Sequence, residues 1–140
     1  MTKIISADVY EYILSRMNDR LEKEGFVRSG KSAFFYRYGE NRKNASVIGF
    51  QKSVDNGPDW LKFRIKYDFV TVLDIEGFWG ERLNLKVLKE HLIGTIRGTE
   101  WYEISEYTLV DSTLAEYYKE RIEPDLEYAI ESLNRDFERK

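Results

Sequence analysis

Residues 45–69, ASVIGFQKSVDNGPDWLKFRIKYDF, decide the fold, because they hold two predicted strands and the turn between them. From Leu61 to Phe69 apolar side chains occupy every second position, and the positions from Trp60 to Asp68 between them are mainly charged. Successive side chains of a strand point to opposite faces of the sheet, so this pattern predicts one apolar and one charged face. We therefore expect an antiparallel sheet that buries only one of its faces.

A helix is predicted at each end of the chain. Residues 7–24 carry apolar side chains three and four residues apart, which places them on one stripe of a helix. Ser6 or Asp8 is expected to cap this helix, with Asp8 and Glu11 in the spacing of a capping box. Gly25 is expected to follow the helix in the left-handed conformation that glycine adopts readily.

The C-terminal helix begins with a capping box of Thr113 and Glu116 and continues with an apolar stripe to Phe137. Pro124 lacks a backbone donor, so we expect it to kink or split this helix, with Glu123 able to cap the second segment. The two helices should cover the apolar face of the sheet.

Further strands are predicted at residues 26–28, 33–38, 92–97 and 101–105. Residues 70–75 either continue the long strand or start another one, and residues 82–93 fit both a helix and a strand. For this segment we expect a short helix or irregular structure up to Glu90. The fold class is then α+β, with five or six antiparallel strands and the N-terminal and long C-terminal helices packed on one face.

Composition indicates one soluble domain over residues 1–140. Hydrophobic residues make up 42% and aromatic residues 15% of the chain, which is enough for a packed core. The chain has no cysteine, which excludes disulfides and thiolate metal sites. Neither a membrane span of about 18 apolar residues nor an apolar signal core is present, so a cytoplasmic location is expected.

The order of elements, with EGFVRSGKSAFFYR after the first helix, VIGFQKS at the end of a strand and HLIGTIRGTEWYEIS before the last helix, resembles DUF4304, a bacterial family of unknown function. The family shows a Gly-Phe motif, a Gln-Lys-Ser after an apolar strand and a Trp-containing segment before a proline-containing helix. This chain departs from the pattern around Ile93, Gly94 and Arg97. The resemblance implies the α+β fold and carries no catalytic residue.

Motifs for catalysis are weak. His91 is the only histidine, so a structural role is favoured over a catalytic triad. The segment from Gly25 to Ser32 matches the phosphate-loop pattern formally, but a helix precedes it and a strand follows, so we interpret it as a turn. No cofactor is therefore expected. A carboxylate-dependent hydrolase remains an alternative, with a cleft rimmed by Trp79 and Trp101 and acids such as Asp74, Glu76 or Glu103.

Charge is unevenly distributed along the chain. Residues 1–70 contain 13 Lys or Arg and 9 Asp or Glu, whereas residues 71–140 contain 9 and 16. The two halves could simply complement each other, or the basic half could attract a partner.

The charged strand face provides the more specific hypothesis. It predicts a non-catalytic binding domain that recognises an acidic protein through a basic and aromatic surface. Single-stranded nucleic acid is the weaker alternative, because the sequence pI is about 5.4. A solvated face without a partner is also compatible with the pattern. The candidate binding residues are Trp60, Lys62, Arg64, Lys66, Lys52 and Arg37.

Overall fold

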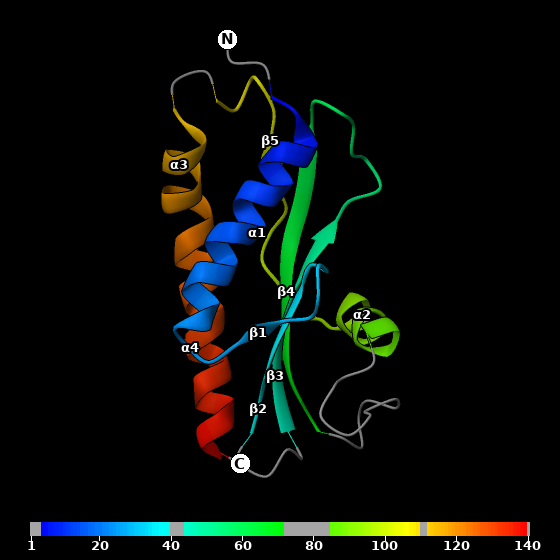
Figure 1. Cartoon of the computed structure of the whole chain (residues 1–140), viewed down its shortest axis with the longest axis vertical. Helices are drawn as coiled ribbons and strands as arrows, with labels where there is room; N and C mark the ends of the chain where they lie inside the picture. Colours follow the sequence, from blue (N-terminus) through cyan, green and yellow to red (C-terminus); the bar gives the residue numbers. More distant parts are fainter. Residues whose placement is uncertain (1–3, 40–43, 72–84, 110–111, 140) are drawn as a thin grey trace.

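The computed structural model of the chain describes residues 4–39, 44–71, 85–109 and 112–139. In these residues five strands form one antiparallel sheet, and each strand pairs with its neighbours in the sequence (Figure 1). The pairing of β3 with β4 runs along the whole of β3, so the stretch that the sequence singled out is the centre of the sheet. The strands are β1 (Val27–Arg28), β2 (Phe34–Tyr38), β3 (Asn44–Lys52), β4 (Leu61–Thr71) and β5 (Tyr102–Ile104).

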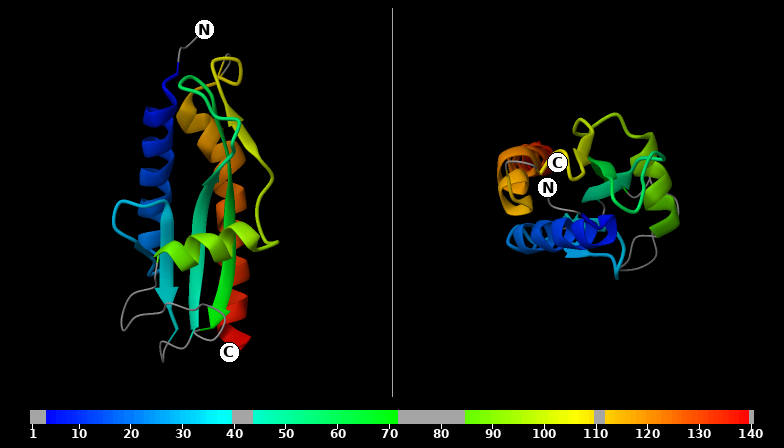
Figure 2. Two further views of the ribbon diagram at one scale, coloured as in Figure 1. Left: turned by 90° about the vertical axis from the view of Figure 1, so that its right-hand side faces the viewer. Right: turned by 90° about the horizontal axis from the view of Figure 1, so that it is seen from above.

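The terminal helices cover one face of this sheet, which confirms the predicted α+β fold. The first is α1 (Ser6–Glu22), and the second runs through α3 (Leu114–Tyr117), the π-helical segment η1 (Tyr118–Ile122) and α4 (Glu123–Arg139). Seen from above, the two helices lie side by side on one face, and a shorter helix lies on the other (Figure 2).

The main core lies between this helix pair and the sheet. The side chains of Leu61, Phe63 and Ile65 on β4 are at most 1% exposed and pack with the apolar stripes of α1 and α4. Phe50 of β3 stacks on Phe63, with 4.3 Å between ring centroids. The period of two in β4 therefore identified its buried face correctly.

The shorter helix α2 (Leu85–Gly94) covers part of the opposite face of the sheet. Its residues Leu88 and Leu92 are buried against a second small core formed by Ala45, Val47 and Val70. The predicted strand at residues 92–97 is wrong. Leu88 and Leu92 are four residues apart, so a helix places both side chains on the face that packs against this core. Residues 95–99 instead run beside β4 and bond to its backbone from Tyr67 N to Arg97 O and from Thr99 N to Ile65 O.

The start of α1 differs from the prediction. Ile5 is its N-cap residue and makes no side-chain cap, so the predicted capping by Ser6 or Asp8 is wrong. Ser6 lies inside the helix, and its N–H donates to the carbonyl of Pro58 in the turn before β4. A tertiary contact thus replaces the local cap. Gly25 follows α1 with φ of 85°, which confirms the predicted left-handed residue.

The C-terminal helix begins as predicted and passes Pro124 without a break. The side chain of Thr113 accepts a hydrogen bond from Glu116 N, as a capping box requires. The N–H of Glu123 donates to the carbonyl of Tyr118, five residues earlier. Glu123 has helical backbone angles and does not cap a separate segment, so that prediction is wrong. A single π turn accommodates the proline while the chain remains helical.

Candidate binding site

Two of the predicted residues, Lys62 and Arg64, lie on the sheet face opposite α1 and α4. The guanidinium of Arg64 stacks on the ring of Trp101 at 4.5 Å from its centroid. Its Nε also donates to Oε1 of Gln51 at 2.9 Å. The ammonium of Lys62 lies 3.5 Å from a carboxylate oxygen of Glu103 and 5.9 Å from the Trp101 ring. We call these residues, Lys62, Arg64, Trp101 and Glu103, the Arg64–Trp101 surface.

Lys66 lies on the same strand face but is only 5% exposed. Its ammonium donates to the carbonyl of Thr95, directly after the C-terminal end of α2, where a positive charge complements the helix dipole. Burial lowers the pKa of Lys66, and the charge of Arg64 lowers it further. The prediction that Lys66 belongs to an open face is therefore wrong: its ammonium holds α2 against the sheet.

Arg37 and Lys52 lie on the helix-covered face, so their predicted place on the charged face is wrong. Arg37 alternates with Tyr36 and shares the face of Phe35, where its guanidinium lies 4.5 Å from the Phe26 ring. It donates to the carbonyl of Glu24 and, at 2.8 Å, to the side chain of Asn134. Burial lowers the pKa of Arg37, while Glu24 opposes this shift.

Lys52 is exposed at the end of β3, on the helix-covered side of that strand. Its ammonium lies over the ring of Tyr10 on α1, 4.0 Å from the centroid. Trp60 is half-buried in the turn before β4, and its backbone bonds to Gly57. Among the described contacts, none joins Trp60 to the Arg64–Trp101 surface. Sequence alternation correctly placed Lys62, Arg64 and Lys66 on one strand face, whereas the separate expectation that Lys52 or Arg37 neighbours them is wrong.

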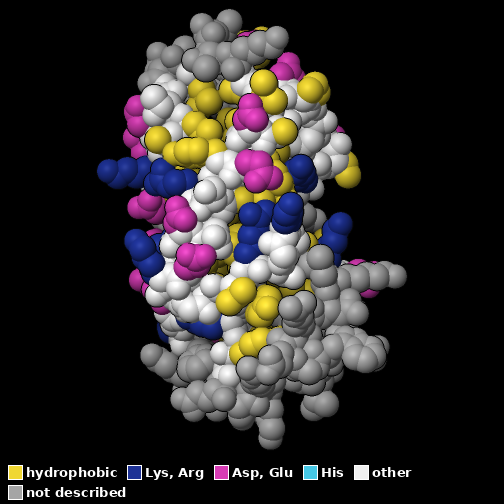
Figure 3. All heavy atoms as spheres, in the orientation of Figure 1, with side chains coloured by type: hydrophobic (Ala, Val, Ile, Leu, Met, Phe, Trp, Pro, Cys, Tyr) yellow, Lys and Arg dark blue, Asp and Glu magenta, His cyan; other side chains and the backbone are white. Residues whose placement is uncertain are grey.

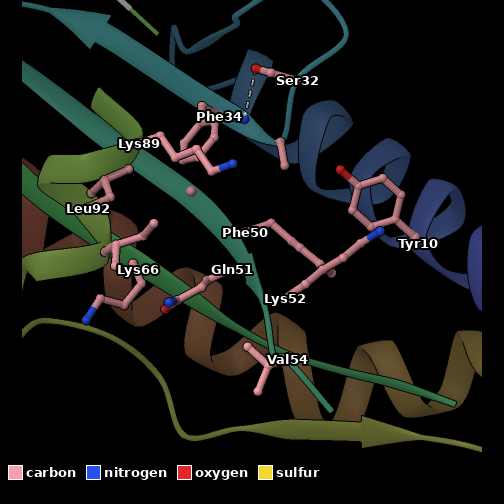
Figure 4. A pocket seen from close by; sticks show the side chains of 13 residues that line it. Tyr10, Ser32, Phe34, Phe50, Gln51, Lys52, Val54, Lys66, Lys89 and Leu92 are labelled. Atoms are coloured by element: carbon pink, nitrogen blue, oxygen red, sulfur yellow. Dashed lines mark hydrogen bonds between the residues drawn. The ribbon is translucent and has the colours of Figure 1, made fainter. Parts of the chain in front are cut away.

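A groove of about 570 Å³ opens beside β3, between α1 and α2 (Figure 4). β2 begins at Phe34, opposite Gly49, so residues 50–52 of β3 extend past its end and leave room for the groove. We call it the lysine-rimmed groove. Its lining consists of Tyr10, Ser32, Ala33, Phe34, Gly49, Phe50, Gln51, Lys52, Val54, Lys66, Lys89, Leu92 and Ile93.

Gly49 shapes the floor of the lysine-rimmed groove. A Cβ atom at this position would lie 2.7 Å from two ring carbons of Phe34 and 2.8 Å from Cδ1 of Leu92. Only glycine lets these two side chains lie across β3 at this distance. The floor is therefore apolar and is built by β2, β3 and α2 together.

The charge of the groove is one-sided. Among the described residues that line it, three are lysines and none is Asp or Glu. Because Lys66 directs its ammonium to Thr95, the accessible cations are Lys52 and Lys89, both exposed. Figure 4 shows Lys89 reaching over Phe34 from α2 and Lys52 reaching toward Tyr10. Lys and Arg side chains also gather at mid-height on the face that carries β1 (Figure 3).

Tyr10 completes the rim. Burial raises the pKa of its hydroxyl, although the nearby Arg28 opposes the shift, so the hydroxyl remains a hydrogen-bond donor at neutral pH. Its ring packs edge-on against Phe50, with 5.0 Å between centroids. The sequence alone does not reveal the groove, because residues 82–93 fit both a helix and a strand and no motif marks Lys89.

His91 joins α2 to β4. Its Nε2 lies 2.8 Å from Oδ2 of Asp68, which also accepts a hydrogen bond from the Thr95 hydroxyl at 3.1 Å. Arg97 lies 3.9 Å from the other oxygen of Asp68 and donates to Asp136 on α4 at 2.7 Å. These contacts attach α2 and the segment after it to the sheet and to α4, consistent with the structural role expected for His91.

The segment that matched the phosphate-loop pattern forms a turn, as predicted. Gly30 has φ of 59°, and the hydroxyl of Ser32 donates to the carbonyl of Ser29 at 2.6 Å. Strand β2 follows at Phe34, so this turn does not open a helix. The arrangement lacks the geometry that cradles phosphates.

A smaller pocket of about 220 Å³ adjoins Trp101 and includes Glu100 and Asp125. Oδ2 of Asp125 accepts a hydrogen bond from the hydroxyl of Tyr102 at 2.5 Å. Burial, together with this bond, raises the pKa of Tyr102. Residues 74, 76 and 79, which the hydrolase hypothesis also invoked, lie outside the described residues. That hypothesis stays a prediction.

Within the described ranges, no group of three or more His, Asp or Glu side chains is placed to hold a metal ion. None of the helices in the described part of the chain is long and apolar enough to cross a membrane. Comparisons with protein-family models, curated proteins and solved structures find no match for this chain. The resemblance to DUF4304 therefore stays a prediction, and function must be argued from the site itself.

Proposed function

We propose that this chain is a cytoplasmic, non-catalytic binding domain that recognises an acidic segment of another protein. The observation that carries the proposal is the stacked pair of Arg64 and Trp101 on the sheet face opposite α1 and α4. Arg and Trp are enriched among the residues that dominate binding energy at protein interfaces. Trp101 is 38% exposed, so its ring remains accessible beside the guanidinium.

The position of Arg64 supports recognition of a carboxylate. Stacking on Trp101 and the bond from Nε to Gln51 hold the guanidinium in one orientation. A preorganised guanidinium loses less side-chain entropy on binding than a free one and can bond a carboxylate through two donors. Lys62, on the same strand face, is paired with Glu103, so Arg64 is the cation of this surface that would meet a ligand carboxylate.

The charges around the Arg64–Trp101 surface favour a protein over a nucleic acid as the binding partner. Glu103 pairs with Lys62, and Glu100 immediately precedes Trp101 in the chain. These carboxylates repel a run of phosphates more strongly than a single acidic side chain that pairs with Arg64. The formal net charge of −3 also differs from that of a typical nucleic-acid-binding domain.

Selection from a phage-displayed random peptide library tests the proposal directly. We expect enriched peptides to contain Asp or Glu beside an apolar residue, and their binding to weaken at high salt. An Arg64→Glu, Trp101→Ala variant, checked to be folded by circular dichroism, should lose these peptides. An Arg135→Glu, Tyr107→Ala variant, in which both residues are exposed and neither lines the pocket that adjoins Trp101, is the matched control. Peptides that bind the first variant as well as wild type would contradict the proposal.

A further inference from the structure

We propose that the lysine-rimmed groove is a separate site for a small amphipathic carboxylate, a molecule with one apolar chain and one anionic end. The proposal is independent of the Arg64–Trp101 surface, because the two sites share none of the side chains that would contact a ligand. It depends on the shape of the groove, its apolar floor and the sign of its charge.

Size and lining identify the apolar part of the ligand. A groove of about 570 Å³ lies in the range that binds small molecules. Phe34, Leu92 and Phe50 form its inner surface, and Ile93, which is 48% exposed, and Val54, which is 99% exposed, extend the apolar surface to its rim. A linear hydrocarbon chain can cover these side chains and remove them from water.

The cations identify the other end of the ligand. Lys52 and Lys89 approach the groove from different elements, β3 and α2, and the lining residues that the structure describes include no carboxylate to neutralise them. Tyr10 holds Lys52 in place through the cation–π contact and has its hydroxyl on the groove side of the ring (Figure 4). A carboxylate between the two ammonium groups would compensate both charges and accept a hydrogen bond from Tyr10.

The charge also excludes other occupants. An alkylammonium of the same length would meet two like charges, and a neutral alkyl chain would gain no attraction from either lysine. The groove therefore distinguishes ligands by the sign of their head group and by the length of their chain.

Calorimetric titration with hexanoate, octanoate and octylammonium tests this proposal. We expect octanoate to bind about fifteenfold more tightly than hexanoate, because each buried methylene strengthens binding about fourfold. Octylammonium should not compete with octanoate. In ¹H–¹⁵N spectra, octanoate should shift the amides of residues 49–52 and 89–93.

Variants test where the carboxylate binds. Lys52→Gln, Lys89→Gln should weaken octanoate binding by about tenfold, since it removes both accessible cations. Lys23→Gln, Lys119→Gln changes two other exposed lysines, both on the helix pair, and should leave the affinity unchanged. All four lysines are exposed, so each variant is expected to fold.

The proposal is overturned by any of three outcomes. The first is the absence of octanoate binding at millimolar concentration. The second is equal binding of octanoate and octylammonium, or an affinity that the Lys52→Gln, Lys89→Gln variant retains. The third is binding to phosphatidylglycerol vesicles without binding of free octanoate, which would assign the lysines to a lipid surface.

Discussion

The substitution Gly49→Ala tests how closely α2 and β2 pack across the sheet. The added methyl group would lie 2.7 Å from Cδ1 and Cε1 of Phe34 and 2.8 Å from Cδ1 of Leu92. These distances are shorter than any unstrained carbon–carbon contact, so both side chains must move. Leu92 is only 1% exposed, which leaves it little room to rotate without disturbing its own core.

The expected loss of stability follows from two opposing contributions. Overpacking against two neighbours costs about 1–3 kcal/mol, whereas replacing a glycine within a strand by alanine gains about 0.5–1 kcal/mol. We therefore expect the free energy of unfolding to fall by about 1.2 kcal/mol. For a domain of this size the melting temperature should fall by roughly 5 °C.

Urea unfolding followed by tryptophan fluorescence measures this change. Gly94→Ala is the matched control, because a Cβ atom at the end of α2 meets no atom within 4 Å, and this variant should be neutral or more stable. In a double-mutant cycle, Phe34→Ala should remove part of the cost of Gly49→Ala, because the contact with Cδ1 of Leu92 remains. A Gly49→Ala protein within about 0.3 kcal/mol of wild type would refute the packing that we describe.

Three further predictions concern the core, a helix start and alkaline pH. Phe63→Ala should lower the free energy of unfolding by about 3–5 kcal/mol, because Phe63 is fully buried; chemical denaturation checks this. Thr113→Ala should cost about 1 kcal/mol by removing the cap of α3, whereas an equal stability of the two proteins would contradict that role. Burial and the bond to Asp125 raise the pKa of Tyr102. At a pH that ionises this hydroxyl in the unfolded chain, it therefore remains protonated in the folded state. This contribution to stability is present below about pH 10 and is lost as pH rises toward the folded-state pKa. Unfolding free energies measured between pH 8 and 11 should therefore fall less steeply for Tyr102→Phe than for wild type, and equal slopes would argue against the linkage.

The sequence by itself determined those helices, strands and caps that depend only on residues close together in the chain. The alternation in residues 61–69 identified the face of β4 that packs against the helix pair, and the apolar stripes identified α1 and the C-terminal helix. Capping by Thr113 and the left-handed Gly25 also follow from residue types within one turn. Since period, capping and backbone conformation are local properties, these features did not require knowledge of the fold.

Only the tertiary structure decided which charges are available to a ligand. Whether a lysine on a strand face is exposed depends on what packs above it, and α2 covers Lys66 because Leu88 and Leu92 fill the space over Ala45, Val47 and Val70. The register between strands placed Arg37 and Lys52 on the helix side. The lysine-rimmed groove joins residues of α1, β2, β3 and α2, and such a site exists only where long-range packing brings these elements together.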